Sequence, residues 1–153
     1  MSSEGSSSIT YRRVPKTFRR RPVERFSRRL EAELAQGRTF DCLITTDAEL
    51  RRLNREFRGK DAVTDVLSFP APASQSLAPA HIGDLAISFP RARAQACEFG
   101  HRTEHEIQIL MLHGLLHLLG MDHENDRGRM ARAEKLWRKR LGLPNGLIER
   151  AHS

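Results

Sequence analysis

The segment from about Thr103 to Leu119 constrains the fold more than any other part of the chain. Read as a helix, it carries apolar residues on almost every side, where a surface helix would show a polar face. A helix that is apolar all round is a buried helix. The segment therefore predicts a central helix surrounded by the rest of the domain, with Gly120 as the left-handed residue that ends it.

Shorter segments with the periodicity of strands and helices lie before and after this one. Strands are predicted near residues 9–14, 40–44, 63–69 and 82–89, and helices near 23–34, 46–57, 90–99 and 130–141. Thr46 and Glu49 have the spacing of a capping box, which opens a helix. Strands that alternate with helices within 153 residues predict one α/β (α+β) domain. We expect a Ser/Arg-rich segment over residues 1–22, the domain over 23–142 and a tail over 143–153.

Three histidines provide the strongest chemical signal in the sequence. His113 and His117 are one turn apart, so they share one face of the predicted central helix. His123 follows the turn at Gly120 and can supply a third nitrogen to the same ion. Three imidazoles that leave one position open are typical of a catalytic zinc site, and each buried imidazole would otherwise need its own polar partner. We expect one Zn²⁺ per chain on these residues, with Asp122 or Glu124 orienting one of the ligand imidazoles.

The spacing of the histidines and of Gly120 matches the metzincin peptidase pattern H-E-x-x-H-x-x-G-x-x-H. The glutamate that acts as general base in that pattern is replaced by Gly114, and glycine cannot move a proton. This difference counts against peptide hydrolysis. The other histidines are interpreted as surface or structural residues, although one of them, His81, begins a strand and could line a cleft; they are His81, His101, His105 and His152.

A second polar group lies where a predicted helix turns into a strand. Arg58 and Lys60 occupy this turn, and a guanidinium there could bind a phosphate with two hydrogen bonds. The alternative is that Arg58 only binds the carbonyls at the end of its helix. Asp65 follows among strand residues, where it could orient Arg58 or fix the turn.

Taken together, these segments resemble the YbeY family. The resemblance rests on the segments Arg58–Asp61, Thr64–Pro70, Gly83–Ser88 and His113–His123, and it extends from about residue 40 to residue 141. It implies a zincin-like fold, with a small mixed sheet beside a central metal-bearing helix. It also implies a zinc-dependent endoribonuclease for single-stranded RNA, acting in rRNA processing and in quality control of the ribosome, with the small ribosomal subunit as partner. The implied ligands are His113, His117 and His123, and the implied functional arginine is Arg58.

The sequence departs from the family pattern at two positions. Val63 stands where the family usually has proline, and Phe57 where it usually has tyrosine. Neither is an expected ligand, so the chemistry implied by the resemblance is unaffected.

The positive charge of the chain is concentrated near its N-terminus. Between Tyr11 and Arg29 nine cations face one acid, a local charge of +8, whereas the whole chain has a net charge of +7. Such a patch attracts RNA or DNA phosphates. The residues expected to bind RNA are Arg12, Arg13, Arg19, Arg20 and Arg21. The alternatives are a solvated helix start and a mitochondrial presequence, the latter disfavoured because the stretch continues directly into a patterned helix.

Composition bears on whether the chain is a membrane, secreted or cytoplasmic protein. No apolar run approaches the length of a membrane helix, and the first eight residues lack the apolar core of a secretory signal. Two cysteines, Cys42 and Cys97, suit free thiols in a reducing cytoplasm. Two other functions remain open: a ribosome-assembly factor in which the metal is only structural, and a metallopeptidase.

Overall fold

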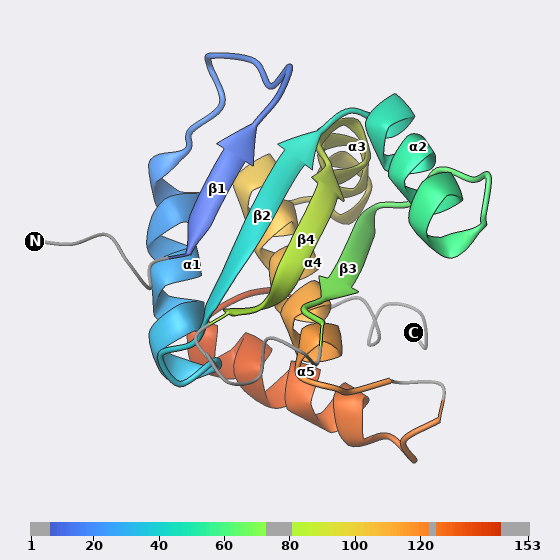
Figure 1. The fold of residues 1–153 in the computed structure, drawn as a ribbon. Helices are drawn as coiled ribbons and strands as arrows, with labels where there is room; N and C mark the ends of the chain where they lie inside the picture. Colours follow the sequence, from blue (N-terminus) through green and yellow to red (C-terminus); the bar gives the residue numbers. More distant parts are fainter. Residues whose placement is uncertain (1–6, 73–80, 123–124, 145–153) are drawn as a thin grey trace, which may run out of the picture.

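The computed structural model describes residues 7–72, 81–122 and 125–144. Within these residues, four strands form one sheet in the order β1-β2-β4-β3, and five helices pack around it (Figure 1). The strands are β1 (Ser8–Tyr11), β2 (Thr39–Thr45), β3 (Val66–Pro70) and β4 (His81–Ser88). The helices are α1 (Arg21–Glu33), α2 (Asp47–Arg58), α3 (Phe89–Phe99), α4 (Thr103–Leu118) and α5 (Arg129–Leu141). Strands β1, β2 and β4 are parallel and the edge strand β3 is antiparallel, so the expected mixed α/β fold is confirmed.

Helix α4 is the buried centre of the fold, as its sequence predicts. Twelve of its 16 residues are buried, and it lies against one face of the sheet (Figure 1). Cys42 and Ile44 of β2 share its core with Leu85 and Ile87 of β4. Burial of each large apolar side chain stabilises the fold by about 1.5–3 kcal/mol. Gly120 follows the helix with φ of 92°, as expected for a left-handed C-terminal residue.

Helix α2 packs on the opposite face of the sheet. Side chains of a strand alternate between faces, so Ala86 points away from α4 and packs with Leu50 of α2 and Leu67 of β3. Near its C-terminal end, α2 lies beside the edge strand, where the ring of Phe57 packs against that of Phe69 of β3 with centroids 5.6 Å apart.

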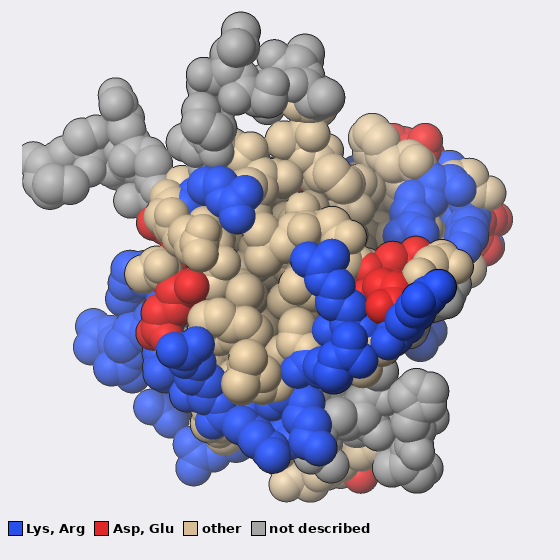
Figure 2. Space-filling view, turned by 90° about the horizontal axis from the view of Figure 1, so that it is seen from below, with Lys and Arg blue, Asp and Glu red and all other residues tan. Residues whose placement is uncertain are grey.

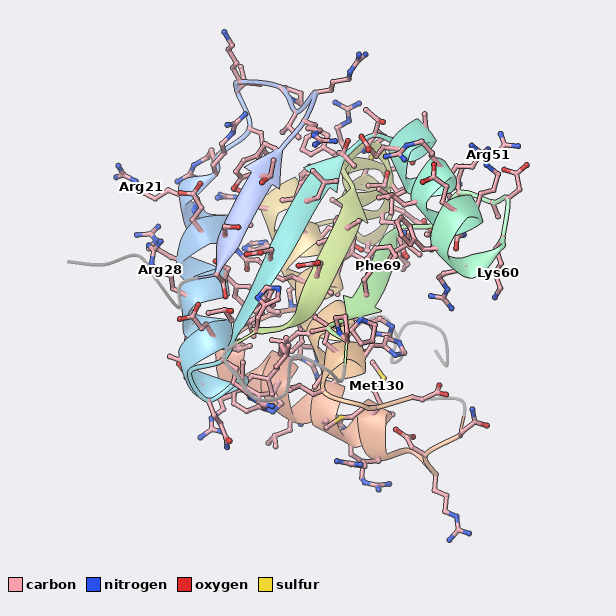
Figure 3. All side chains as sticks on the ribbon, viewed as in Figure 1. Arg21, Arg28, Arg51, Lys60, Phe69 and Met130 are labelled. Carbon is pink, nitrogen blue, oxygen red and sulfur yellow. The ribbon has the colours of Figure 1, made fainter. Side chains whose placement is uncertain are left out.

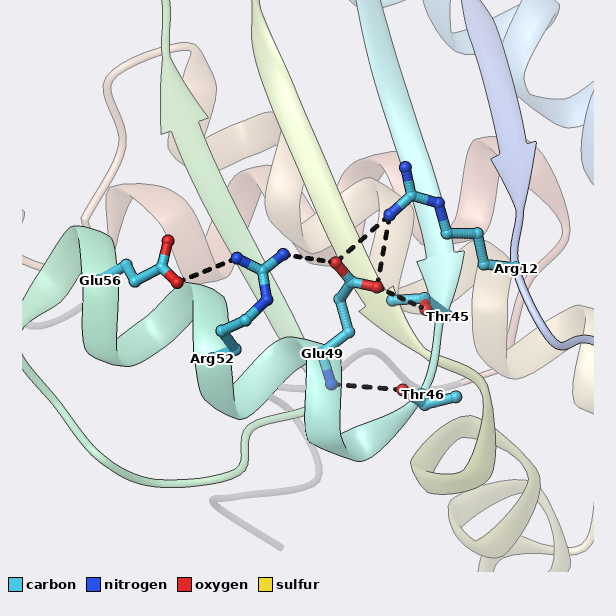
Figure 4. A network of polar contacts seen from close by, with 6 residues as sticks. All are labelled: Arg12, Thr45, Thr46, Glu49, Arg52 and Glu56. Carbon is cyan, nitrogen blue, oxygen red and sulfur yellow. Dashed lines mark hydrogen bonds and ion pairs between the residues drawn. The ribbon is translucent and has the colours of Figure 1, made fainter.

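Half of the predicted capping box is present at the start of α2. The hydroxyl of Thr46 accepts a hydrogen bond from the backbone N–H of Glu49. The Glu49 carboxylate binds the guanidinium groups of Arg12 and Arg52 instead of reaching back to Thr46 (Figure 4). These contacts join β1, through the residue that follows it, to α2.

Two strand ends differ from the sequence prediction by three residues each: β1 ends at Tyr11 and not at residue 14, and β3 begins at Val66 and not at residue 63. The backbone N–H of Ser88 donates to the Asp65 carbonyl, and the Gln95 amide donates to the Asp65 carboxylate. Asp65 therefore fixes the turn before β3 against β4 and α3.

Residues outside the expected 23–142 domain take part in the fold. Strand β1 pairs with β2, and Val14 and Leu143 belong to the main core. No helix in the described ranges has the length and apolar character needed to cross a membrane.

Candidate active site

Two of the three predicted metal ligands lie together near the C-terminal end of α4. The rings of His113 and His117 have their centroids 4.9 Å apart and are inclined at 75°. His113 is buried, and His117 is partly buried. His123, the third predicted ligand, and Glu124 lie outside the described residues. The helix therefore brings the first two imidazoles to one place, as their spacing predicts.

Helix α5 contributes a buried partner that sequence reasoning missed. Oε2 of Glu134 lies 2.7 Å from Nδ1 of His113, and the Glu134 side chain is only 1% exposed. Asp122, predicted for a role of this kind, accepts a hydrogen bond from the Asn125 amide in the turn after α4. The proposed role of Asp122 stays a prediction.

The donor set around His113 fits a metal ion. Metal-ligating histidines usually donate their second ring N–H to a carboxylate, which fixes the tautomer and the orientation of the ring. Glu134 stands in that relation to Nδ1 of His113, so Nε2 is the ring atom suited to a metal. Imidazole nitrogens are common zinc ligands. His113 and His117 thus offer two nitrogen atoms of the kind that zinc sites use.

The residue next to the first histidine lets α4 approach the sheet closely. A Cβ atom at Gly114 would lie 2.8 Å from Cδ2 of Leu85 and 3.3 Å from Cγ2 of Val66. The Ser68 hydroxyl donates to the Gly114 carbonyl at 3.0 Å. Position 114 therefore forms part of the contact between helix and sheet.

Arg58 is the last residue of α2 and is exposed. The other three arginines of this helix form ion pairs: Arg51 and Arg55 with Asp61, and Arg52 with Glu49 and Glu56. The hydrogen bond from Arg51 lowers the pKa of Asp61. No carboxylate in the described part of the chain forms an ion pair with Arg58, so its guanidinium has the freedom to bind an anionic ligand.

A second group of metal-type ligands lies on the sheet. Donor atoms of Asp41, His81 and Asp84 all lie within 4.8 Å of one another, so these residues could hold a cation. Nδ1 of His81 is 2.9 Å from the Thr39 hydroxyl, and Nε2 is 3.0 Å from Asp84. Asp41 also accepts hydrogen bonds from Ser8. His81, which the sequence suggested could line a cleft, thus lies on the sheet beside two carboxylates.

The N-terminal arginines have different surroundings. Arg12 forms an ion pair with Glu49 at 3.3 Å, and Arg20 lies over the Tyr11 ring, whose own pKa is raised by burial. Arg19 lies 3.9 Å from a carboxylate oxygen of α4, in a hollow that it lines together with two further arginines, Arg93 and Arg102.

The remaining two arginines of this set are exposed. Arg13 lies in the segment after β1, and Arg21 projects away from the sheet at the start of α1 (Figure 3).

Comparison with known proteins agrees with the motifs. The family model described as "Endoribonuclease YbeY" matches residues 8–142. A protein of that name from Solibacter usitatus is 66% identical over 153 residues, which is the whole of both chains. Another from Koribacter versatilis is 51% identical over 108 residues, which cover 71% of this chain and 68% of that protein.

The fold has a solved counterpart. A protein from Thermotoga maritima, solved in solution, superimposes with a TM-score of 0.57 at 25% identity, over 86% of this chain and 85% of that one. The family model and the full-length relative from Solibacter usitatus show that this chain belongs to the YbeY endoribonuclease family.

Proposed function

We propose that this protein is a zinc-dependent endoribonuclease that cleaves single-stranded RNA during the maturation and quality control of ribosomal RNA. The observation that carries the metal-dependent part is the pair of imidazoles on α4, with His113 held by the buried carboxylate of Glu134. Family membership supports RNA as the substrate.

One zinc ion per chain is assigned to His113, His117 and His123. When bound, zinc supplies a Lewis acid that polarises a phosphate oxygen. Ligand imidazoles must be neutral, so metal affinity should fall below about pH 6. We prefer this site to the group formed by Asp41, His81 and Asp84, because an all-imidazole donor set is more typical of catalytic zinc.

Arg58 is assigned to the phosphate group that is cleaved. Its guanidinium can donate two parallel hydrogen bonds to the phosphate oxygens and balance the charge that grows on them. Its exposed position at the end of α2, without an ion-pair partner among the described carboxylates, supports this role.

The central experiment is metal analysis beside RNA cleavage for the wild type and for His117→Ala. We expect one metal per chain and cleavage of a single-stranded RNA in the wild type, and loss of both in the variant. A fully occupied metal site in His117→Ala would contradict the ligand assignment. The ends of the products identify the attacking group, because a 2′,3′-cyclic phosphate requires attack by the RNA 2′-hydroxyl.

Digestion of casein and binding of rRNA, measured beside RNA cleavage, address the two other functions. A metallopeptidase would digest casein, and Gly114 in place of a glutamate counts against this outcome. An assembly factor with a structural metal would bind rRNA without cleaving a model strand.

The N-terminal cations are assigned to RNA phosphates without sequence preference. Arg12, Arg13, Arg19, Arg20 and Arg21 carry this proposal. Replacement of the last three by serine should flatten the plot of log affinity against log salt by up to about 2, at about 0.7 per phosphate contact. An unchanged slope would refute it. The small ribosomal subunit in the cytoplasm is the partner that fits this set of proposals.

A further inference from the structure

The outward face of α5 carries a group of exposed cations outside the N-terminal segment. Its exposed cations are Arg127, Arg129, Arg132, Lys135, Lys139 and Arg140, which are called the α5 cation face below. Arg129, Arg132, Lys135 and Lys139 recur at spacings of three and four residues and so share one side, and Arg140 directly follows Lys139. That side is opposite the buried residues Met130, Glu134 and Leu141. Figure 2 views the molecule from below, the side on which Figure 1 places α5, and shows several groups of lysine and arginine side chains together with acidic patches.

Two described acidic residues of this region contact groups other than the α5 cation face. The carboxylate of Glu134 is buried against His113, and that of Asp126 accepts from the backbone N–H of Met130 at the start of the helix. Within the described ranges, no member of the α5 cation face forms an ion pair with a carboxylate. In α2, by contrast, Arg51, Arg52 and Arg55 are all paired. The two helices therefore differ in how much charge they offer to a ligand.

The face also has apolar surface and a neighbour of the same sign. Leu136 is 59% exposed among the cations, and Arg140 lies 4.9 Å from the centre of the Trp137 ring. Arg29 of α1 donates to the backbone carbonyl of Arg140, so the cations of α1 and α5 adjoin. Cations beside exposed apolar side chains suit a polyanion whose bases are unpaired.

We propose that the α5 cation face binds the phosphate backbone of single-stranded RNA and leads the strand toward the imidazoles of α4. The opposite side of the same helix carries Glu134, which contacts His113, so RNA held on α5 lies one helix away from the proposed metal ligands. This inference rests on the proposed function, because it takes RNA as the substrate. It assigns a binding surface beyond the N-terminal arginines.

The test measures binding of the full-length protein to a 2′-O-methyl oligonucleotide, which cannot undergo attack by a 2′-hydroxyl, at several salt concentrations. The variant combines Arg132→Gln, Lys135→Gln and Lys139→Gln, because glutamine is a good helix former. The matched control combines Arg51→Gln, Arg52→Gln and Arg55→Gln, which removes the same number of charges from α2.

Three lost phosphate contacts should lower the salt slope by about 2, which corresponds to about 100-fold weaker binding at 0.1 M salt. The control should stay within about threefold of the wild type. Equal losses in both variants would reduce the effect to net charge and overturn the proposal, as would an unchanged slope in the α5 variant. Circular dichroism checks that each variant is folded.

Two further measurements distinguish this binding surface from the proposed nuclease function and from a membrane-binding surface. A wild type that binds RNA through α5 but does not cleave it contradicts the proposed function and leaves the surface standing. If the wild type cleaves RNA but the α5 variant keeps the salt slope of the wild type, the proposed function stands and the binding surface on α5 is refuted. Association with anionic phosphatidylglycerol vesicles that is lost in the α5 variant, without a change in RNA binding, would assign the face to a membrane and overturn the proposal.

Discussion

The contact between Glu134 and His113 is the place where one substitution tests the proposed metal centre most directly. The two side chains meet at 2.7 Å and are 1% and 10% exposed, so solvent screens their interaction little. Glu134→Gln keeps an acceptor oxygen of nearly the same shape and removes the negative charge. The substitution therefore weakens the interaction that orients the His113 ring and opens no cavity.

The expected effect is a loss of metal affinity. Loss of a carboxylate that orients a ligand histidine typically weakens metal binding 10–100-fold, which is about 1.4–2.7 kcal/mol. The weakening should be measured by competition with a chromophoric chelator at neutral pH, where the ligand imidazoles are neutral. Unchanged affinity in Glu134→Gln would refute the idea that this pair orients a ligand.

The chain offers a matched control on the same central helix. His101 and Glu106 form a second pair, with Nε2 and Oε1 2.6 Å apart and side chains 10% and 0% exposed. Glu106→Gln makes the same chemical change about two helical turns from His113. It should lower the free energy of unfolding and leave metal affinity unaltered. Equal weakening of metal binding by both variants would mean that the whole fold has loosened.

Three further predictions concern other parts of the molecule. Arg58→Ala should greatly reduce RNA cleavage with metal content unchanged, and Arg58→Lys should rescue poorly because a point charge lacks the two-pronged geometry; wild-type rates would return Arg58 to a surface role. Gly83→Ala should lower the free energy of unfolding, measured by urea titration, by about 3 kcal/mol or more, because φ is 150° and a Cβ would lie 2.5 Å from a backbone oxygen of β3. Gly142→Ala, where φ is 73° and a Cβ would meet open space, should lower it by about 1 kcal/mol. Equal losses in the two variants would refute the steric explanation. A hydrogen bond from Arg52 lowers the pKa of Glu49, so this carboxylate stabilises the fold above its ordinary pKa and the contribution is lost as pH falls through the folded value. Glu49→Gln should therefore narrow the difference in unfolding free energy between pH 7 and pH 3, and an unaltered difference would contradict this.

Periodicity and stop signals predict the elements of this fold because they act locally. The all-round apolar character of residues 103–119 defines α4, and glycine at positions 59, 100 and 142 ends three helices in the left-handed conformation. The first two histidines meet for the same reason, since a spacing of four residues fixes their places on one helix.

Local sequence patterns do not predict the contacts between elements that lie far apart in the chain. Glu134 lies 21 residues from His113, on a helix whose charged residues resemble an ordinary solvated surface. Its inward position depends on how α5 packs against α4, and no local pattern encodes that packing. The pairing of Arg12 with Glu49 and the order of the strands depend on tertiary packing in the same way.

Gly114 connects the sequence pattern with the packing. Its lack of a carboxylate already separates the chain from the metzincin pattern on chemical grounds, because no general base follows the first histidine. The structure adds a steric reason, since a side chain at this position would meet Leu85 at 2.8 Å and Val66 and Ser68 at 3.3 Å. Leu85 is itself buried, so the crowding falls within the core shared by α4 and the sheet. A glutamate at position 114 would therefore have to bury its carboxylate in the helix–sheet contact, at a cost of several kcal/mol if unpaired. Glycine at position 114 therefore lets α4 lie directly against the sheet, whereas a glutamate there would require the neighbouring side chains of Leu85, Val66 and Ser68 to shift.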